Sequence, residues 1–152
     1  MILVTGGAGY IGSHTVLALN ETGAQTLVLD NFSRGHRDTC FGTKTVEGDL
    51  RDGELLKRIF AENSIEAVIH FAAHSQVGES MATPEIYYDN NIGGSLSLLR
   101  AMREAGVKDI VFSSSASVYG EPEAVPIEES ARLNPTSVYG ETKFMTEKML
   151  TA

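Results

Sequence analysis

Short apolar runs alternate with longer segments of helical periodicity along the whole chain. The runs have the length and composition of buried strands, and they cover residues 2–5, 26–30, 45–48, 67–71 and 110–113. Helices are expected between them, at residues 10–22, around 55–60, at 84–105 and from 137 onwards. This order predicts an α/β fold: a doubly wound parallel sheet of about five strands, with helices on both faces. We expect one domain over residues 1–152.

A long irregular connection is expected between the last strand and the last helix. Residues 116–136 hold three of the four prolines, and no helical or strand periodicity crosses them. Connections of this length in compact domains are often functional.

Composition narrows the classes of partner. The chain has 12 basic and 20 acidic side chains and a formal charge of −8, which disfavours nucleic acid and anionic membranes. No apolar run approaches the ~20 residues of a membrane helix, and we expect no signal peptide, since the first strand begins at Ile2. Cys40 is the only cysteine, so an intrachain disulfide is excluded and a reducing, cytoplasmic location is expected.

A glycine-rich segment joins the first strand to the first helix. It reads Gly6-Gly7-Ala8-Gly9-Tyr10-Ile11-Gly12 and contains the pattern Gly-x-Gly-x-x-Gly. Glycines allow the backbone to approach a pyrophosphate, and the positive end of the helix dipole favours the anion. A tight structural turn is the alternative, but the strand before it and the helix after it favour a dinucleotide site.

An acidic residue follows at the position that such a site requires. Asp30 ends the second strand, 18 residues after Gly12, where a carboxylate binds the hydroxyls of the adenine ribose. Its charge would repel a 2′-phosphate, which favours NAD over NADP. Arg34 lies nearby and offers a phosphate the opposite charge.

Candidate catalytic groups lie in the second half of the chain. Tyr139 and Lys143 are four residues apart, so they share one face of the last helix. Lowering a tyrosine pKa from about 10 towards 7 takes roughly 4 kcal/mol, which a nearby ammonium group and a nicotinamide charge can supply. Ser113-Ser114-Ser115 ends the fifth strand, at the sheet edge where such folds bind ligands. The alternatives are a surface pair on a helix for Tyr139 and Lys143, and a run of capping serines for Ser113-Ser114-Ser115.

No metal site is expected. His70 and His74 flank the end of a strand and do not share a helical face, and no cluster of Cys or Glu has metal-ligand spacing.

Eight segments, in order along the chain, carry a family resemblance. They are Val4-Thr5-Gly6-Gly7-Ala8-Gly9-Tyr10-Ile11-Gly12-Ser13, Leu29-Asp30-Asn31, Glu47-Gly48-Asp49, His70-Phe71-Ala72-Ala73, Val77-Gly78-Glu79-Ser80, Tyr87-Tyr88-Asp89-Asn90-Asn91, Ser113-Ser114-Ser115-Ala116-Ser117-Val118-Tyr119-Gly120 and Tyr139-Gly140-Glu141-Thr142-Lys143. With them the chain resembles the amino-terminal part of the UDP-glucose (UDP-galactose) 4-epimerases, in the extended short-chain dehydrogenase/reductase superfamily. Family members are roughly twice as long. The resemblance therefore implies that residues 1–152 are an NAD-binding Rossmann domain that ends before the sugar-nucleotide-binding domain.

The resemblance also implies a set of site residues. The cofactor NAD would contact Gly6, Gly9, Tyr10, Ile11, Gly12, Asp30, Asn31, Phe32, Ser33, Asp49, Leu50, Phe71, Ala72, Ala73, Asn90, Tyr139 and Lys143. Tyr139, Lys143 and Ser115 match the catalytic residues, and Ser115 and Tyr139 would also contact the UDP-sugar. The implied reaction interconverts UDP-glucose and UDP-galactose by reversible hydride transfer at the sugar 4-position, through a 4-keto sugar. Family members are commonly dimers, so a homodimer is an expected assembly.

Two departures and three alternatives accompany this resemblance. Ser75 stands where many members have lysine, and Ser117 replaces a common threonine. Nucleotide-sugar 4,6-dehydratases carry an Asp-Glu pair where this chain has Ala116-Ser117, which argues against them. Other nucleotide-sugar epimerases and decarboxylases of the superfamily remain open, as does a non-catalytic NAD-binding module.

Overall fold

The computed structural model describes residues 1–152, which form two compact units. The sheet unit comprises residues 1–72 and 96–113, and the helical unit comprises residues 73–95 and 114–152. The single domain expected over residues 1–152 stays a prediction.

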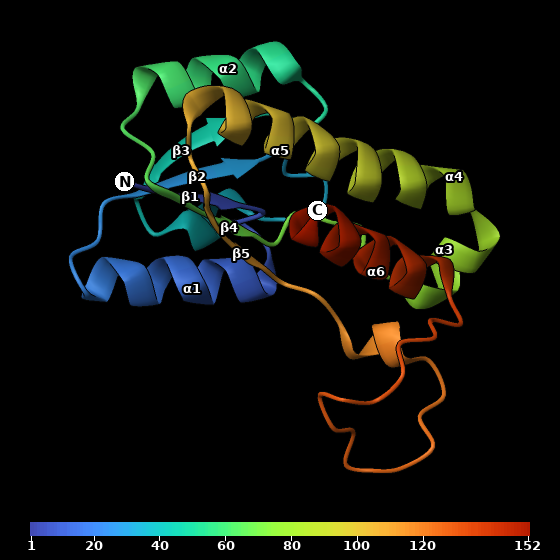
Figure 1. The fold of residues 1–152 in the computed structure, drawn as a ribbon. Helices are drawn as coiled ribbons and strands as arrows, with labels where there is room; N and C mark the ends of the chain where they lie inside the picture. Colours follow the sequence, from blue (N-terminus) through green and yellow to red (C-terminus); the bar gives the residue numbers. More distant parts are fainter. The chain divides into compact units, whose positions relative to one another are not determined.

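A parallel sheet of five strands forms the centre of the sheet unit (Figure 1). Its strand order is β3-β2-β1-β4-β5, with β1 Ile2–Thr5, β2 Thr26–Asp30, β3 Lys44–Glu47, β4 Ala67–His70 and β5 Asp109–Phe112. Thr5 at the end of β1 pairs with Leu29 on one side and His70 on the other, so the strands end at the same edge. The predicted fold class is confirmed, although β3 and β5 each begin and end one residue earlier than expected and β4 ends one residue earlier.

Helices cover both faces of this sheet, as predicted. Figure 1 shows α1 on one face, and α2 and the greater part of α5 on the other; their bounds are Tyr10–Glu21, Gly53–Glu62 and Gly94–Ala105. Alternate strand residues divide between the two layers, because successive side chains of a strand point to opposite faces. Val4 and Val28 pack with Val16 of α1, whereas Leu3 and Leu27 pack with Leu56 of α2 and Leu98 of α5.

Short helices and one longer helix make up the helical unit. They are α3 Val77–Ala82, α4 Pro84–Tyr87, the π-helical segment η2 Tyr88–Gly93, the 3₁₀ turn η3 Ala116–Tyr119 and α6 Val138–Thr151. Helix α6 begins where the sequence predicts, because Ser137 caps it: its hydroxyl accepts a hydrogen bond from the Gly140 amide at 3.1 Å.

The continuous α-helix expected over residues 84–105 is wrong in its middle. The chain is α-helical up to Tyr87, π-helical from Tyr88 to Gly93, and α-helical again from Gly94. The wider turn coincides with Asn91, whose side chain bonds the backbone of His74 and the hydroxyl of Thr142. Such π-helical turns are frequent at functional sites.

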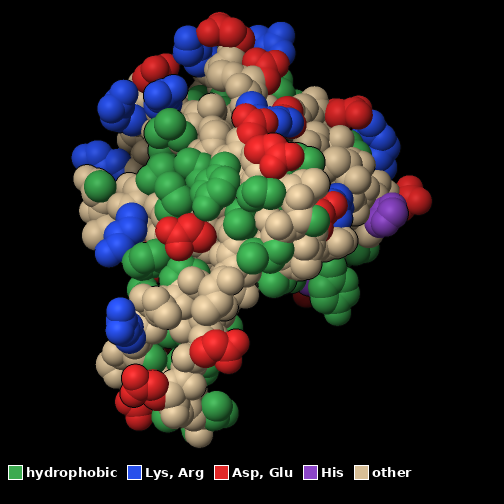
Figure 2. Space-filling model, turned by 90° about the vertical axis from the view of Figure 1, so that its right-hand side faces the viewer, with side chains coloured by type: hydrophobic (Ala, Val, Ile, Leu, Met, Phe, Trp, Pro, Cys, Tyr) green, Lys and Arg blue, Asp and Glu red, His purple; other side chains and the backbone are tan.

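The irregular connection predicted over residues 116–136 begins with the 3₁₀ turn η3, and residues 121–136 have no regular element (Figure 1). On the face drawn in Figure 2, Lys and Arg side chains are interspersed with Asp and Glu and form no continuous basic surface. None of the helices has both the length and the apolar character that crossing a membrane requires.

Candidate functional site

The glycine segment closes a tight turn between β1 and α1. Gly6 has φ +72°, and a Cβ there would lie 2.5 Å from the backbone nitrogen of Ala72. A Cβ at Gly12 would lie 2.2 Å from the carbonyl oxygen of Gly6. Both distances are far shorter than any van der Waals contact, so the turn requires glycine at these two positions.

The first turn of α1 is suited to an anion. Gly9 is the N-cap and offers no side-chain acceptor, and no acidic residue lies in the first turn. Backbone N–H groups at a helix start have no intrahelical partner, and the helix dipole adds positive potential. Tyr10 and Ile11 are 83% and 59% exposed, so this end of the helix is accessible. These features fit the pyrophosphate of a dinucleotide.

The Asp30 carboxylate lies directly beside this turn. Its Oδ2 accepts a hydrogen bond from the Ala8 amide at 3.0 Å, and its Oδ1 accepts one from the Phe32 amide at 2.8 Å. Only 9% of Asp30 is exposed. A carboxylate has about four acceptor positions, so Asp30 retains capacity for ribose hydroxyls while the turn holds it in place.

A second acidic residue belongs to the same edge of the sheet. Asn31 Nδ2 donates to Asp49 Oδ2 at 3.1 Å, and Asn31 Oδ1 accepts from the Ser33 amide at 3.0 Å. Hydrogen bonds from Arg51 hold the pKa of the Asp49 carboxyl well below its usual range, so this group is ionised. Leu50, also predicted to contact the cofactor, is 8% exposed and packs in the core.

The loop after β2 is anchored to the glycine turn. Ala8 O accepts from the His36 amide at 3.1 Å and from the Thr39 hydroxyl at 2.8 Å. Phe32 has φ +54°, and the Arg37 guanidinium lies 4.2 Å from the centre of its ring. Arg37 also pairs with Glu47, so this loop has a defined conformation beside Asp30.

Two further residues predicted to contact the cofactor, Phe71 and Ala72, directly follow β4. The amides of Phe71 and Ala72 both donate to Thr5 O, at 2.9 and 3.1 Å, which joins them to the start of the glycine turn. The sheet unit thus brings together the predicted cofactor residues from Gly6 to Ala72. Ala73, Asn90, Ser115, Tyr139 and Lys143 belong to the helical unit.

Tyr139 and Lys143 lie one turn apart on α6. Lys143 Nζ is 5.9 Å from the centre of the Tyr139 ring. Lys143 is only 4% exposed, and this burial lowers its pKa to about 8. The pair thus places a buried lysine beside the face of the Tyr139 ring.

Ser115 approaches α6 through the backbone. Its hydroxyl caps η3 by accepting from the Ser117 amide at 3.1 Å. The carbonyl of Ser117 in turn lies against Gly140, where a Cβ would be 2.6 Å from that oxygen. Glycine after Tyr139 therefore allows η3 and the first turn of α6 to pack together. The neighbouring Ser114 hydroxyl donates to Glu147, further along α6.

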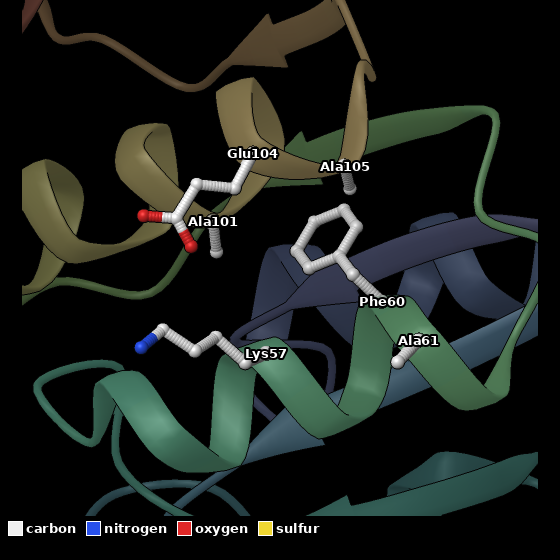
Figure 3. A pocket seen from close by; sticks show the side chains of 6 residues that line it. All are labelled: Lys57, Phe60, Ala61, Ala101, Glu104 and Ala105. Atoms are coloured by element: carbon white, nitrogen blue, oxygen red, sulfur yellow. The ribbon is translucent and has the colours of Figure 1, made fainter.

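The hollow between α2 and α5 contains none of the predicted site residues. It has a volume of about 300 Å³, and Figure 3 shows Lys57 and Glu104 at one end and Phe60 at the other. Its lining residues lie in the later turns of both helices, whereas ligands of parallel α/β sheets bind beyond the carboxyl ends of the strands. It is therefore separate from the candidate site.

A sequence model described as the NAD dependent epimerase/dehydratase family matches residues 2–152. The chain belongs to this family. The turn, the acidic residue after β2 and the Tyr139–Lys143 pair are thus found in a chain whose relatives use nucleotide cofactors.

The proteins that are similar to this chain include UDP-glucose 4-epimerases. The enzyme of Halalkalibacterium halodurans is 56% identical over 97% of this chain and 44% of its own length. The crystal structure of the Brucella ovis enzyme in complex with NAD has a TM-score of 0.96 and 45% identity, over 99% of this chain and 46% of that one. The crystal structure of the Bifidobacterium longum enzyme in complex with NAD+ and UDP has a TM-score of 0.94 and 43% identity, over 99% of this chain and 48% of that one. The chain spans less than half the length of these relatives.

Three polar residues that position helix α6, which carries Tyr139 and Lys143, were not predicted from the sequence. Ser80 accepts from the Tyr139 amide, Asn91 bonds Thr142, and Ser137 caps the helix. A sequence signal existed for Ser137, which lies just before the helical segment. Ser80 belongs to the segment Val77-Gly78-Glu79-Ser80, which carried the family resemblance without an assigned role.

Proposed function

We propose that this chain supplies the NAD-binding and proton-transfer part of a UDP-glucose 4-epimerase. The observation that carries the proposal is the buried Lys143 ammonium one helical turn from the Tyr139 ring. Epimerisation by hydride transfer requires a base that removes the proton of the sugar 4-hydroxyl, and a phenolate stabilised by a neighbouring cation is suited to this role.

The cofactor residues of the proposal are those around the glycine turn. The α1 amino terminus would hold the pyrophosphate, and Asp30 with Asn31 would hold the adenine ribose. Gly6, Phe32, Ser33, Asp49, Leu50, Phe71, Ala72, Ala73 and Asn90 complete the proposed set. The Asp30 carboxylate, tied to Ala8 and Phe32, supports NAD over NADP because its charge repels a 2′-phosphate. Bound NAD would accept a hydride from the sugar C4 and return it.

Residues of this chain would remove and return the proton of the sugar 4-hydroxyl. Tyr139 would accept it from the sugar 4-hydroxyl and give it back when the keto sugar is reduced. The positive charge of Lys143 would favour the phenolate, and Ser115 would donate a hydrogen bond to the sugar oxygen. The substrate would be UDP-glucose or UDP-galactose, and the net reaction is an isomerisation.

A non-catalytic NAD-binding module is the second candidate. The specific observation in its favour is that this chain matches only 44% of the Halalkalibacterium enzyme. This chain thus covers less than half of that relative, and the nucleotide-binding features lie within the covered half. In this case the glycine turn and Asp30 would bind NAD without turnover.

One experiment separates the two candidates. NAD binding to the purified chain is measured by calorimetry, and conversion of UDP-galactose to UDP-glucose is assayed on the same sample. The epimerase predicts both activities, with turnover at least about 100-fold lower in Tyr139→Phe and NAD affinity nearly unchanged. Tyr88→Phe, which removes an exposed hydroxyl, is the matched control. NAD binding without turnover would identify the module, and failure to bind NAD would contradict both candidates.

We propose a homodimer in the cytoplasm as the setting of this activity, without a nucleic-acid partner. The single cysteine supports a reducing compartment, and the formal charge of −8 argues against a polyanion. The homodimer rests on the family resemblance and is tested by the mass of the purified chain in solution.

A further inference from the structure

A buried serine of α3 contacts the backbone of the proposed catalytic residue. Ser80 is fully buried, and its Oγ lies 3.1 Å from the amide nitrogen of Tyr139, 59 residues further along the chain. The same hydroxyl lies 2.6 Å from the carbonyl oxygen of Val77. Its single proton is donated to Val77 O, so Ser80 is the acceptor for the Tyr139 N–H.

This hydrogen bond falls at a position where a helix has no partner of its own. Tyr139 is the second residue of α6, and the N–H groups of a first turn lack intrahelical acceptors. The next amide, of Gly140, is satisfied by the local cap Ser137 at 3.1 Å. Two serine hydroxyls thus hold consecutive amides of α6. Ser137, directly before the helix, holds Gly140, and Ser80, from helix α3, holds Tyr139.

The segment that carries Ser80 is itself fixed. Helix α3 has only six residues, a length that is not stable alone. Tyr87 of α4 is fully buried, and its hydroxyl lies 2.6 Å from Glu79 Oε2. It also accepts from the Gln76 amide at 3.0 Å. Tyr87 therefore holds the start of α3 and the residue next to Ser80.

We propose that Ser80 is a positioning residue for Tyr139: by holding the Tyr139 amide it sets the direction in which the phenol leaves the helix. This assignment rests on the proposed function for its catalytic meaning. The segment Val77-Gly78-Glu79-Ser80 gains a role from it, with Glu79 joined to Tyr87 and Ser80 joined to Tyr139.

The hydrogen bond is tested by amide exchange followed by NMR, which needs neither NAD nor substrate. In Ser80→Ala the Tyr139 amide is expected to exchange at least about tenfold faster, corresponding to roughly 1.4 kcal/mol, while the Gly140 amide keeps its protection. Ser137→Ala should show the reverse pattern. Ser80→Thr, which keeps the hydroxyl, should restore the protection of Tyr139. Unchanged exchange at Tyr139 in Ser80→Ala overturns the proposal.

The orientation of the phenol is tested separately, since a merely structural cap would leave it in place. Nuclear Overhauser contacts between the Tyr139 ring and the Lys143 side chain should weaken by at least about half in Ser80→Ala and return in Ser80→Thr. Thr146→Val removes another buried hydroxyl of α6, one that donates within the helix, and should leave these contacts intact. Unchanged ring contacts in Ser80→Ala reduce Ser80 to a cap and contradict the positioning role.

Steady-state kinetics of Ser80→Ala tests whether the positioning of Tyr139 matters for the proposed epimerase reaction. With an active chain, Ser80→Ala should lower kcat about tenfold or more, with KM for UDP-galactose changed by less than about twofold. Equal kcat in Ser80→Ala and the unchanged chain contradicts the positioning role. An inactive chain contradicts the epimerase proposal for this sequence, and the exchange and ring-contact measurements still decide the inference.

Discussion

The Asp30 carboxylate accepts a hydrogen bond from the amide of Ala8, 22 residues earlier in the chain and 3.0 Å away. The residue that would recognise the ribose is therefore held by the turn that would bind the pyrophosphate. A second bond, from the Phe32 amide, fixes the other carboxylate oxygen. One acidic side chain thus joins the glycine turn to the loop that follows β2.

Replacing this carboxylate by an amide should weaken NAD binding and relax its selectivity. In Asp30→Asn one oxygen remains as an acceptor, while the charge and one of the two backbone bonds are lost. We expect a loss of stability of about 1–3 kcal/mol, because a largely buried N–H loses its acceptor. The ratio of NADP to NAD affinity should rise about tenfold or more, as repulsion of a 2′-phosphate disappears. Calorimetric titration with both cofactors measures this ratio.

Asp38→Asn provides the control for net charge. Asp38 is exposed in the short 3₁₀ turn Arg37–Cys40 and accepts no bond from the glycine turn. The two variants have equal charge, so an equal change of cofactor ratio would mean that Asp30 has no specific role.

A methyl group at Gly12 should disrupt the turn. The added Cβ would lie 2.2 Å from the Gly6 carbonyl oxygen, and backbone atoms cannot move aside as a flexible side chain can. We expect Gly12→Ala to cost about 1–3 kcal/mol of unfolding free energy and to abolish NAD binding. Urea denaturation and calorimetry measure the two effects.

Gly53→Ala is the matched substitution at a helical glycine. Gly53 begins α2, and a Cβ there has no heavy atom within 4 Å. Its stability should be unchanged or slightly increased, since alanine favours a helix. Similar losses in both variants would show that the close approach at Gly12 does not matter.

The strands and most helices of this fold could be predicted, because each depends on residues that are close in sequence. The run from Thr26 to Asp30 is apolar enough to be buried on both faces, and Gly106 follows the last turn of α5. The π-helical turn could not be predicted in this way. It depends on Asn91 contacts with His74 and Thr142, which are 17 and 51 residues away.

In the candidate site, too, the features set by local sequence could be predicted and those set by long-range contacts could not. The glycine turn, Asp30 and the Tyr139–Lys143 pair have fixed local spacings that the sequence displays. Ser80 has none, because α3 is a short helix without apolar periodicity and its contact with Tyr139 spans 59 residues. Long-range hydrogen bonds between side chain and backbone leave no repeat in a sequence.

Buried Lys143 should make stability depend on pH in the alkaline range. Its pKa is lowered from 10.5 to about 8 by burial, so above pH 8 the folded chain releases this proton while the unfolded chain still holds it. Stability rises with pH wherever the unfolded state binds more protons. The unfolding free energy of the chain, relative to Lys143→Met, should therefore rise between about pH 8 and 10.5, by up to about 1.4 kcal/mol per pH unit.

Urea denaturation at intervals of half a pH unit measures this difference. Below pH 8 the lysine is charged in both states, so the difference between the two chains should be constant. Lys148→Met, which removes an exposed lysine of the same helix, should show no such slope. A flat difference between pH 8 and 10.5 for Lys143→Met would mean that the ammonium is not held in a buried environment.

Replacing the side chain of Asn91 should destabilise the helical unit. Its amide accepts from the His74 N–H at 2.8 Å and donates to His74 O at 3.1 Å and to Thr142 Oγ1 at 3.0 Å, with only 3% exposed. Asn91→Leu keeps the volume but leaves four groups without this partner, the fourth being Asn90 Nδ2, which donates to Asn91 Oδ1 at 3.0 Å. Each buried group left unsatisfied costs about 1–3 kcal/mol, so a loss of at least about 2 kcal/mol is expected. Thr142→Val removes one of the four Asn91 bonds, together with the bond that the Thr142 hydroxyl donates to Tyr139 O, and should cost less.

In a double-mutant cycle of Asn91→Leu and Thr142→Val, the second substitution should cost less in the presence of the first, because both remove the same bond between the π-helical turn and α6. Strict additivity would show that the bond contributes nothing, and the π-helical turn would then need another cause.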